Sequence, residues 1–159
     1  MDFNIFVSYS THDLEKVELL RAQLEDTPIK VFIAEHSVTP SQNLRETISI
    51  AIEESDLFVV LWSKNAQDSE WVSQEIGQAN ALKKTILPLV LSEGMSLPGF
   101  INDLKYIDVH KNVEHALAKS REVIVHLYNE KAEKHNKQKN SEIIAMMAIG
   151  AFLLWAISE

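Results

Sequence analysis

Short apolar runs alternate with amphipathic segments through most of the chain. Runs rich in β-branched and aromatic residues occupy positions 3–9, 29–33, 57–62 and 85–91, and a weaker run covers 106–109. Runs of this kind that end in polar clusters are typical of strands buried on both faces. Segments 13–24, 43–54, 70–83 and 112–130 carry apolar residues at helical spacing. The pattern predicts five strands that alternate with helices.

This alternation predicts an α/β fold with a parallel sheet, right-handed crossovers and helices on both faces. For five strands we expect the flavodoxin-like order 2-1-3-4-5, in which ligands bind beyond the carboxyl ends of the strands where the order reverses. That point lies here between the first and third strands. Their polar ends make Ser8, Tyr9 and Trp62 candidate lining residues, although Tyr9 and Trp62 fit a structural role equally well.

The helix predicted at 70–83 places a tryptophan and a carboxylate on one face. Trp71 and Glu75 are four residues apart, and Gln78 and Leu82 continue the same stripe. Because burying an unpaired carboxylate is costly, Glu75 is expected to find a partner or to line a pocket. A solvated Glu75 and a Trp71 that serves mainly as a core anchor remain open as alternatives.

The composition of the chain argues against several classes of function. A chain of 159 residues with 46% hydrophobic content fits one globular domain, and its net charge of −8 makes it a poor ligand for nucleic acid. The absence of cysteine excludes disulfides and thiolate metal sites, and the six histidines are scattered, so no metal site is expected. No signal peptide is expected. With four glycines and no Gly-rich phosphate loop, a dinucleotide-binding Rossmann domain or P-loop enzyme is improbable.

Four segments, taken in order and spacing, resemble the Toll/interleukin-1 receptor (TIR) domain family over about residues 3–129. They are FVSYS at 6–10, VFI at 31–33 with the loop that follows it, ESDLFVVL at 54–61, and SEWVSQE at 69–75. The last resembles the segment that holds the catalytic glutamate of TIR domains that cleave NAD+. The loop departs from many bacterial members, which have Pro-Gly where this chain has Pro40-Ser41.

The resemblance implies a prokaryotic NAD+ hydrolase that releases nicotinamide and gives ADP-ribose or a cyclic ADP-ribose signal, in antiviral defence. NAD+ is then the substrate, and no cofactor is expected. Glu75 would hold the ribose hydroxyls and stabilise the oxocarbenium-like state, Trp71 would wall the pocket, and Ser69 would tune the same loop. Self-association through TIR domains and a downstream effector are the implied protein partners. The family's BB loop corresponds to a segment that contains Glu35, His36, Pro40 and Ser41.

Two other functions remain in view. A non-enzymatic TIR adaptor would act by assembly alone and would depend on Pro40 or Ser41 instead of Glu75. A response-regulator receiver shares the sheet order, but the acidic cluster that it needs at the strand ends is missing.

The C-terminal segment changes character after a TIR domain placed at residues 1–129. Residues 130–142 are charged and amide-rich, as in a linker or a helix extension, and residues 143–157 form an apolar run from Ile143 to Ile157. As a helix this run is about 22 Å long, shorter than a hydrocarbon core of about 30 Å. We nevertheless predict a hydrophobic helix at 143–158 that anchors a cytoplasmic TIR domain to the inner or plasma membrane; packing in an oligomer is the alternative.

Overall fold

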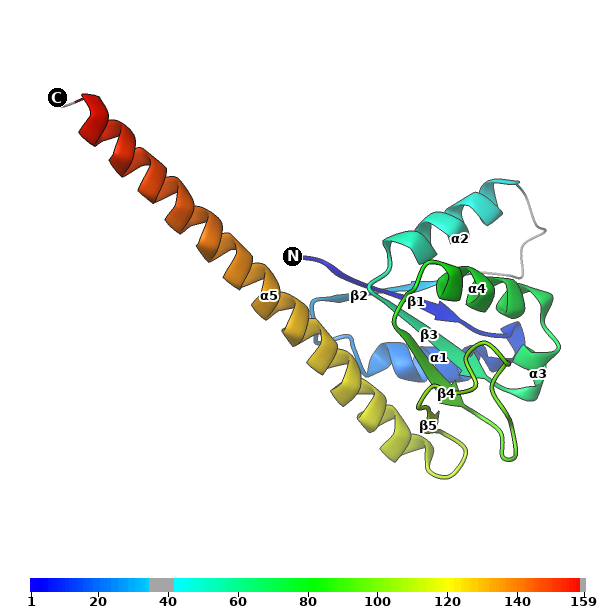
Figure 1. Cartoon of the computed structure of the whole chain (residues 1–159). Coiled ribbons are helices and arrows are strands. Elements are labelled where there is room, and N and C mark those ends of the chain that lie inside the picture. Colours follow the sequence, from blue (N-terminus) through cyan, green and yellow to red (C-terminus); the bar gives the residue numbers. More distant parts are fainter. Residues whose placement is uncertain (35–41, 158–159) are drawn as a thin grey trace. The chain divides into compact units, whose positions relative to one another are not determined.

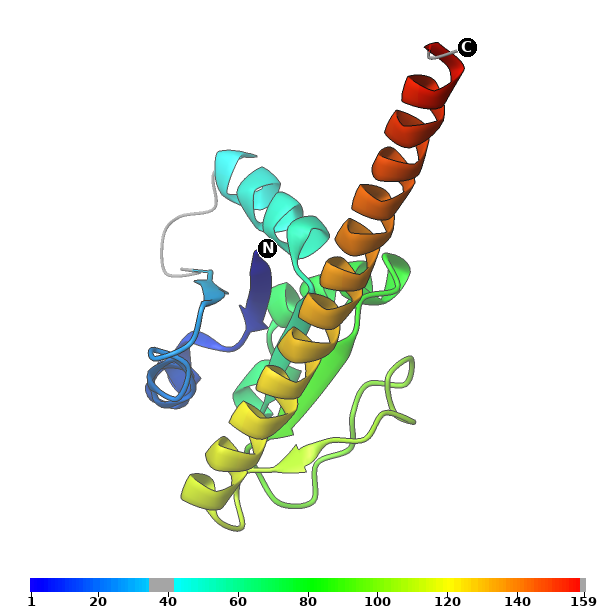
Figure 2. The ribbon, with the colours of Figure 1, turned by 90° about the vertical axis from the view of Figure 1, so that its left-hand side faces the viewer.

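A five-stranded parallel sheet lies at the centre of the part of the chain from Asp2 to Val123 (Figures 1 and 2). The computed structural model describes residues 1–34 and 42–157, and only the backbone of residues 42–43 and 148–157. The strand order is β2-β1-β3-β4-β5, which confirms the predicted order. The strands are β1 (Phe3–Ser8), β2 (Ile29–Ile33), β3 (Leu57–Trp62), β4 (Ile86–Val90) and β5 (Ile107–Asp108).

Helices follow β1, β2, β3 and β5, whereas residues 91–106, which connect β4 to β5, contain no helix. In chain order they are η1 (Thr11–Asp13), α1 (Leu14–Ala22), α2 (Gln42–Glu54), α3 (Lys64–Gln67), α4 (Glu70–Ala81) and α5 (Val113–Ile157). The sequence pattern did not indicate the four-residue helix α3 or the separate short helix η1. The N-terminus of α3 is capped by Ser63, whose hydroxyl accepts a hydrogen bond from the Ala66 amide.

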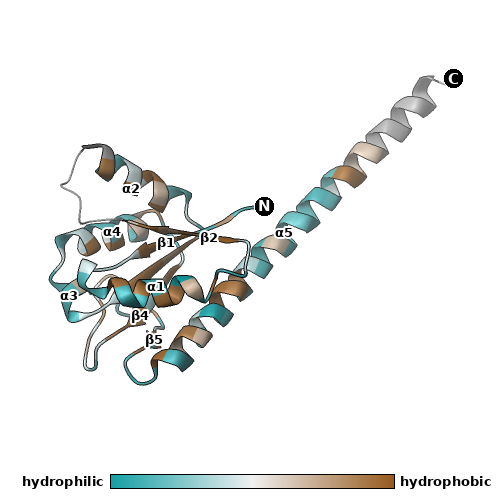
Figure 3. Ribbon diagram, turned by 180° about the vertical axis from the view of Figure 1, so that it is seen from behind, coloured by the Kyte–Doolittle hydropathy of each residue, from teal (hydrophilic) through white to brown (hydrophobic). Residues whose placement is uncertain are grey.

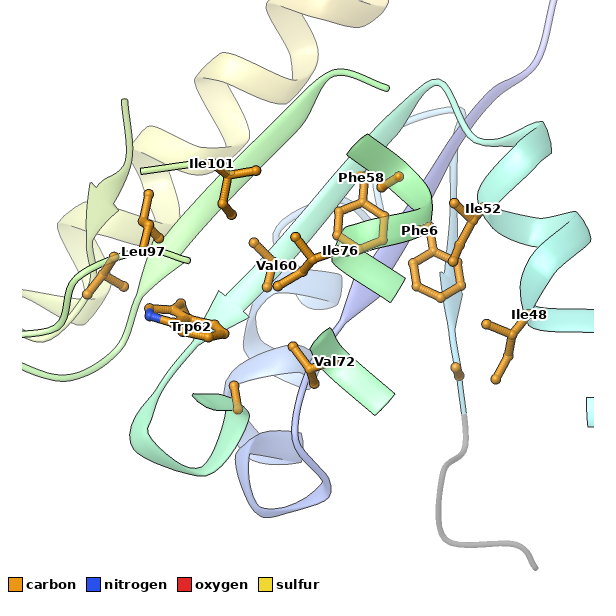
Figure 4. Close-up of a cluster of buried hydrophobic side chains, with 14 residues drawn as sticks. Phe6, Ile48, Ile52, Phe58, Val60, Trp62, Val72, Ile76, Leu97 and Ile101 are labelled. Atoms are coloured by element: carbon orange, nitrogen blue, oxygen red, sulfur yellow. The ribbon is translucent and has the colours of Figure 1, made fainter. Parts of the chain in front are cut away.

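An apolar cluster lies between the sheet and the helices α2 and α4 (Figure 4). Phe6 of β1 is fully buried there and stacks between Phe32 and Phe58, with ring centroids 5.5 and 5.4 Å apart. Colouring by hydropathy shows the strands as the most apolar elements (Figure 3). Because side chains alternate along a strand, Ser8 shares the face of Phe6 and so points toward α4.

Helix α4 buries a different set of positions from the predicted stripe, with Glu75 common to both and Trp71 and Gln78 half-buried. Its buried positions are Val72, Glu75, Ile76 and Ala79. The predicted continuation to Leu82 is wrong, since that side chain is 42% exposed. The helix ends at Ala81, Leu82 is its C-cap, and Lys83 takes up a left-handed conformation with φ of 54°, so Leu82 lies in the turn that ends the helix.

Two compact parts make up the chain, Asp2–Val123 and Ile124–Glu159 with Met1. Helix α5 covers residues 130–142, so that segment is a helix extension, and it continues to Ile157. The side chains of Ile144, Met146 and Met147 are 67–69% exposed. Among the described residues no helix is long and apolar enough to cross a membrane, so the predicted anchor at residues 143–157 is not supported.

The first part of α5 is tied to the segment after α1 by an arginine. Arg121 donates two hydrogen bonds to the carboxylate of Asp26, at 2.6 and 2.9 Å, and a third to the carbonyl oxygen of Gln23. The paired hydrogen bonds from Arg121 lower the pKa of Asp26 below its ordinary value of 3.8. The fold therefore favours the ionised form of this carboxyl group.

Lys83→Gly is expected to stabilise the protein by about 0.5–1 kcal/mol, because glycine adopts the left-handed conformation without steric cost. Urea unfolding at neutral pH measures the difference. The control is Lys119→Gly in α5, where the same replacement removes a helix-forming residue and should cost about 1 kcal/mol. Equal losses in both variants would contradict the role assigned to the backbone at Lys83.

Asp26→Asn is expected to lower the free energy of unfolding at pH 7 and to have no effect in strong acid. The pKa of Asp26 is depressed in the fold, so its contribution is present above the ordinary value of 3.8 and is lost as the pH falls through the folded value. Urea unfolding of wild type and variant at pH 7 and at about pH 2 tests this. A difference that stays constant across this range would show that the ion pair is not its source.

Candidate active site

The carboxylate of Glu75 lies at the centre of the candidate site. Glu75 is on the sheet-facing side of α4 and is only 2% exposed. The hydroxyl of Ser8, at the carboxyl end of β1, donates a hydrogen bond to Oε2 of Glu75 at 2.5 Å. The helix and the central strand therefore hold this acid in one position.

A hollow of about 330 Å³ lies next to this pair, at the carboxyl ends of β1 and β3. We call it the Tyr9/Trp71 hollow. Its walls come from the segment after β1 and from the segment that runs through α3 to the start of α4. The lining residues are Tyr9, Ser10, Thr11, His12, Asn65, Asp68, Ser69 and Trp71.

Glu75 does not itself line the Tyr9/Trp71 hollow. Its hydrogen-bond partner Ser8 directly precedes Tyr9 in β1, and Glu75 follows Trp71 by one turn of α4. Tyr9 and Trp71 therefore connect the lining of the hollow to the Ser8–Glu75 pair. Trp71 also lies under the guanidinium of Arg45, 5.6 Å from its ring centroid, which joins α4 to the start of α2.

A second serine and carboxylate join the two walls of the hollow. Ser63 follows β3 and is nearly fully buried, and its hydroxyl donates to Oδ2 of Asp13 at 2.5 Å. Asp13 ends the short helix η1 after β1, and Ser63 is the N-cap that precedes α3. The contact fixes the segment that carries His12 against the segment that carries Asn65.

The predicted lining residues occupy different places. Tyr9, Ser69 and Trp71 line the Tyr9/Trp71 hollow, and Ser69 also caps α4 by accepting a hydrogen bond from the Val72 amide. Ser8 is fully buried against Glu75. Trp62 lies in the apolar cluster, where its indole N–H donates to the carbonyl oxygen of Ser96 at 3.0 Å (Figure 4).

The predicted BB-loop residues Glu35, His36, Pro40 and Ser41 lie outside the described residues. Asn65 and Asp68 line the hollow but were not singled out from the sequence, because α3 is too short to show a helical period. The signal in the sequence that could have indicated α3 was Ser63, since serine is a preferred residue at a helix N-cap. No group of three or more histidine, aspartate or glutamate side chains in the described part of the chain could hold a metal ion.

A larger hollow of about 440 Å³ lies near the amino end of β1 and beside β2. Its lining includes Asn4, Lys30, Phe32 and Glu54, of which Lys30 forms an exposed ion pair with Asp2. It contains no buried carboxylate and lies at the end of β1 away from Ser8. We therefore choose the candidate site by its nearness to the buried carboxylate of Glu75, and not by the size of the hollow.

Similar structures share this fold with low sequence identity. The TIR domain of a Toll-related receptor from Hydra magnipapillata is 25% identical, with a TM-score of 0.58 over 73% of this chain and 92% of that one. A CMP N-glycosidase from Clostridium botulinum is 22% identical, with a TM-score of 0.55 over 74% and 98%. A prokaryotic SEFIR domain is 15% identical, with a TM-score of 0.57 over 77% and 92%.

The family comparison covers most of the chain. No curated protein matches the sequence. The model of the TIR domain family matches residues 5–125, which contain β2 to β5, all of β1 except its first two residues, and also Ser8, Glu75 and the Tyr9/Trp71 hollow. This protein therefore belongs to the TIR domain family.

Proposed function

We propose that this protein is an NAD+ hydrolase in which Glu75 is the catalytic carboxylate. The observation that carries the proposal is the placement of one buried acid, held by Ser8, beside a hollow at the carboxyl ends of β1 and β3. Ligands of open α/β sheets bind at this edge. A hollow of about 330 Å³ is at the lower end of the range for small-molecule sites, about 300–1,000 Å³.

The chemistry needs a single carboxylate. When the bond between nicotinamide and ribose breaks, the pyridinium nitrogen takes the bonding electron pair, and nicotinamide leaves as a neutral ring. Positive charge develops on the ribose, and an anion nearby stabilises it. Water then adds to the anomeric carbon and loses a proton, which gives ADP-ribose; attack by the adenine ring instead would close a cyclic product.

The fold is compatible with this class of reaction, since one of the similar structures is named as a CMP N-glycosidase. In the proposal the ribose of NAD+ reaches Glu75 past Tyr9 and Trp71, and Ser69 holds the start of α4. Self-association through TIR domains is part of the proposal, and Glu35, His36, Pro40 and Ser41 are its proposed loop. The proposal includes neither attachment to a membrane nor a downstream effector.

One observation favours the alternative, a non-enzymatic TIR adaptor. Glu75 is held by Ser8 and is not among the residues that line the hollow, which is also the arrangement of a structural polar pair. In that case the protein would act by assembly alone. Association would then depend on Pro40 or Ser41 and would not change when Glu75 is replaced.

Glu75→Gln is expected to reduce nicotinamide release from NAD+ by about 100-fold or more, because the amide keeps the shape and loses the charge. Purified full-length protein is assayed at high concentration in detergent, with chromatography of nicotinamide and ADP-ribose. The matched control is Glu70→Gln, which makes the same change on the same helix at an exposed position outside the hollow.

Three results decide between the two functions. Loss of activity in Glu75→Gln alone, with an unchanged thermal unfolding midpoint, supports the hydrolase. Turnover that survives in Glu75→Gln removes Glu75 from the mechanism. If the wild type releases no nicotinamide in any assembled state, while Pro40→Ala abolishes self-association, the adaptor is the better account.

A further inference from the structure

We propose that Ser8 is a positioning residue that acts on the reaction through Glu75 and makes no contact with the substrate. The inference deepens the proposed function and depends on it for its kinetic test. Sequence position alone suggested Ser8 as a lining residue, because it ends a strand at the edge where ligands bind. Its surroundings point to a different role.

The side chain of Ser8 is enclosed. It is 0% exposed, it is absent from the lining of the Tyr9/Trp71 hollow, and the following residues Tyr9 and Ser10 provide that lining instead. A substrate held in the hollow would meet those neighbours first. Ser8 is thus set behind the wall of the site.

The hydroxyl of Ser8 has one proton, and that proton is directed to Oε2 of Glu75. The hydrogen bond joins residues 67 positions apart and spans from the central strand to α4. Since β1 is paired on both sides, with β2 and with β3, its carboxyl end is a rigid base for this contact. Ser8 therefore sets where one carboxylate oxygen lies and how the carboxylate plane is turned.

Such a contact matters more for the rate than for substrate binding. Electrostatic stabilisation requires the anion to be in place before charge develops, and a misplacement of about 1 Å can cost about 100-fold in rate. Loss of the hydroxyl would remove this hydrogen bond and with it one constraint on the orientation of the carboxylate. We expect a lower kcat with little change in KM, because the residues that line the hollow are untouched.

The test compares Ser8→Ala with Ser8→Thr, which keeps the hydroxyl, and Ser8→Cys, a near-isosteric replacement with a weaker donor that serves if alanine is not tolerated. The control is Ser120→Ala. Ser120 is also 0% exposed, and its hydroxyl donates to the carbonyl oxygen of Ala116 within α5 at 2.8 Å, so the same group is removed away from Glu75.

The kinetic readout is kcat and KM for NAD+ in the full-length protein. We expect Ser8→Ala to lose about 10- to 100-fold in kcat while KM changes by less than about twofold, Ser8→Thr to restore most of the rate, and Ser120→Ala to match the wild type. An unchanged kcat in Ser8→Ala overturns the proposal. A higher KM at constant kcat also overturns it, because Ser8 would then contact the substrate.

A second readout needs no activity, so a failure of the hydrolase proposal can be recognised separately. The side-chain carboxyl carbon of Glu75 gives an NMR signal that is assigned by its absence in Glu75→Gln. A shift of this signal in Ser8→Ala and not in Ser120→Ala supports the positioning contact, even if the wild type cleaves no NAD+. An unshifted signal in Ser8→Ala overturns it.

Discussion

The hydrogen bond between Ser8 and Glu75 is the interaction on which the candidate site depends. A carboxylate on the core-facing side of a helix is costly to bury, and the face of α4 that carries it is otherwise made of Val72, Ile76 and Ala79. The hydroxyl of Ser8 offsets part of that cost and ties α4 to the strand at the centre of the sheet. One contact thus satisfies a buried polar group and orients an acid beside the Tyr9/Trp71 hollow.

The surrounding contacts support this arrangement from several sides. Ser63 and Asp13 join the two walls of the hollow, and Gln78 donates to the hydroxyl of Ser49 at 2.6 Å, which joins α4 to α2. Lys84 donates to the carbonyl oxygen of Glu53, near the end of α2, and to that of Ser55, just after the helix. The contacts of Ser63 and Lys84 lie at the ends of helices, where backbone groups lack partners within the helix, and the Gln78–Ser49 contact joins two helices along their length. The apolar cluster stabilises the fold, and the polar contacts fix the geometry at its edge.

Much of the fold could be predicted from the sequence because its strands are short, apolar and separated by turn-forming polar clusters. The burial of Glu75 followed from its position on an apolar helix face. The position of the Trp62 side chain was harder to predict. It shares a face of the strand with Phe58 and Val60, but its N–H donates to the carbonyl oxygen of Ser96, which lies in the loop after β4. The prediction for Leu82 was wrong because the helix ends at Ala81, and the apolar spacing of the sequence does not show where a helix ends. Contacts that join residues far apart in the chain leave no local pattern.

The pairing of β1 with both neighbours has a consequence for insertions and deletions. Ser8 lies opposite Val60 of β3, two residues beyond the pair formed by Phe6 and Phe58. A shift of β1 by a single residue would bring Val7 or Tyr9 to the place of Ser8 and send the hydroxyl to the opposite face, leaving the acid against a hydrocarbon or phenol side chain. The polar pair therefore selects one register of the central strand, so β1 should tolerate changes of length far less than the loops around it.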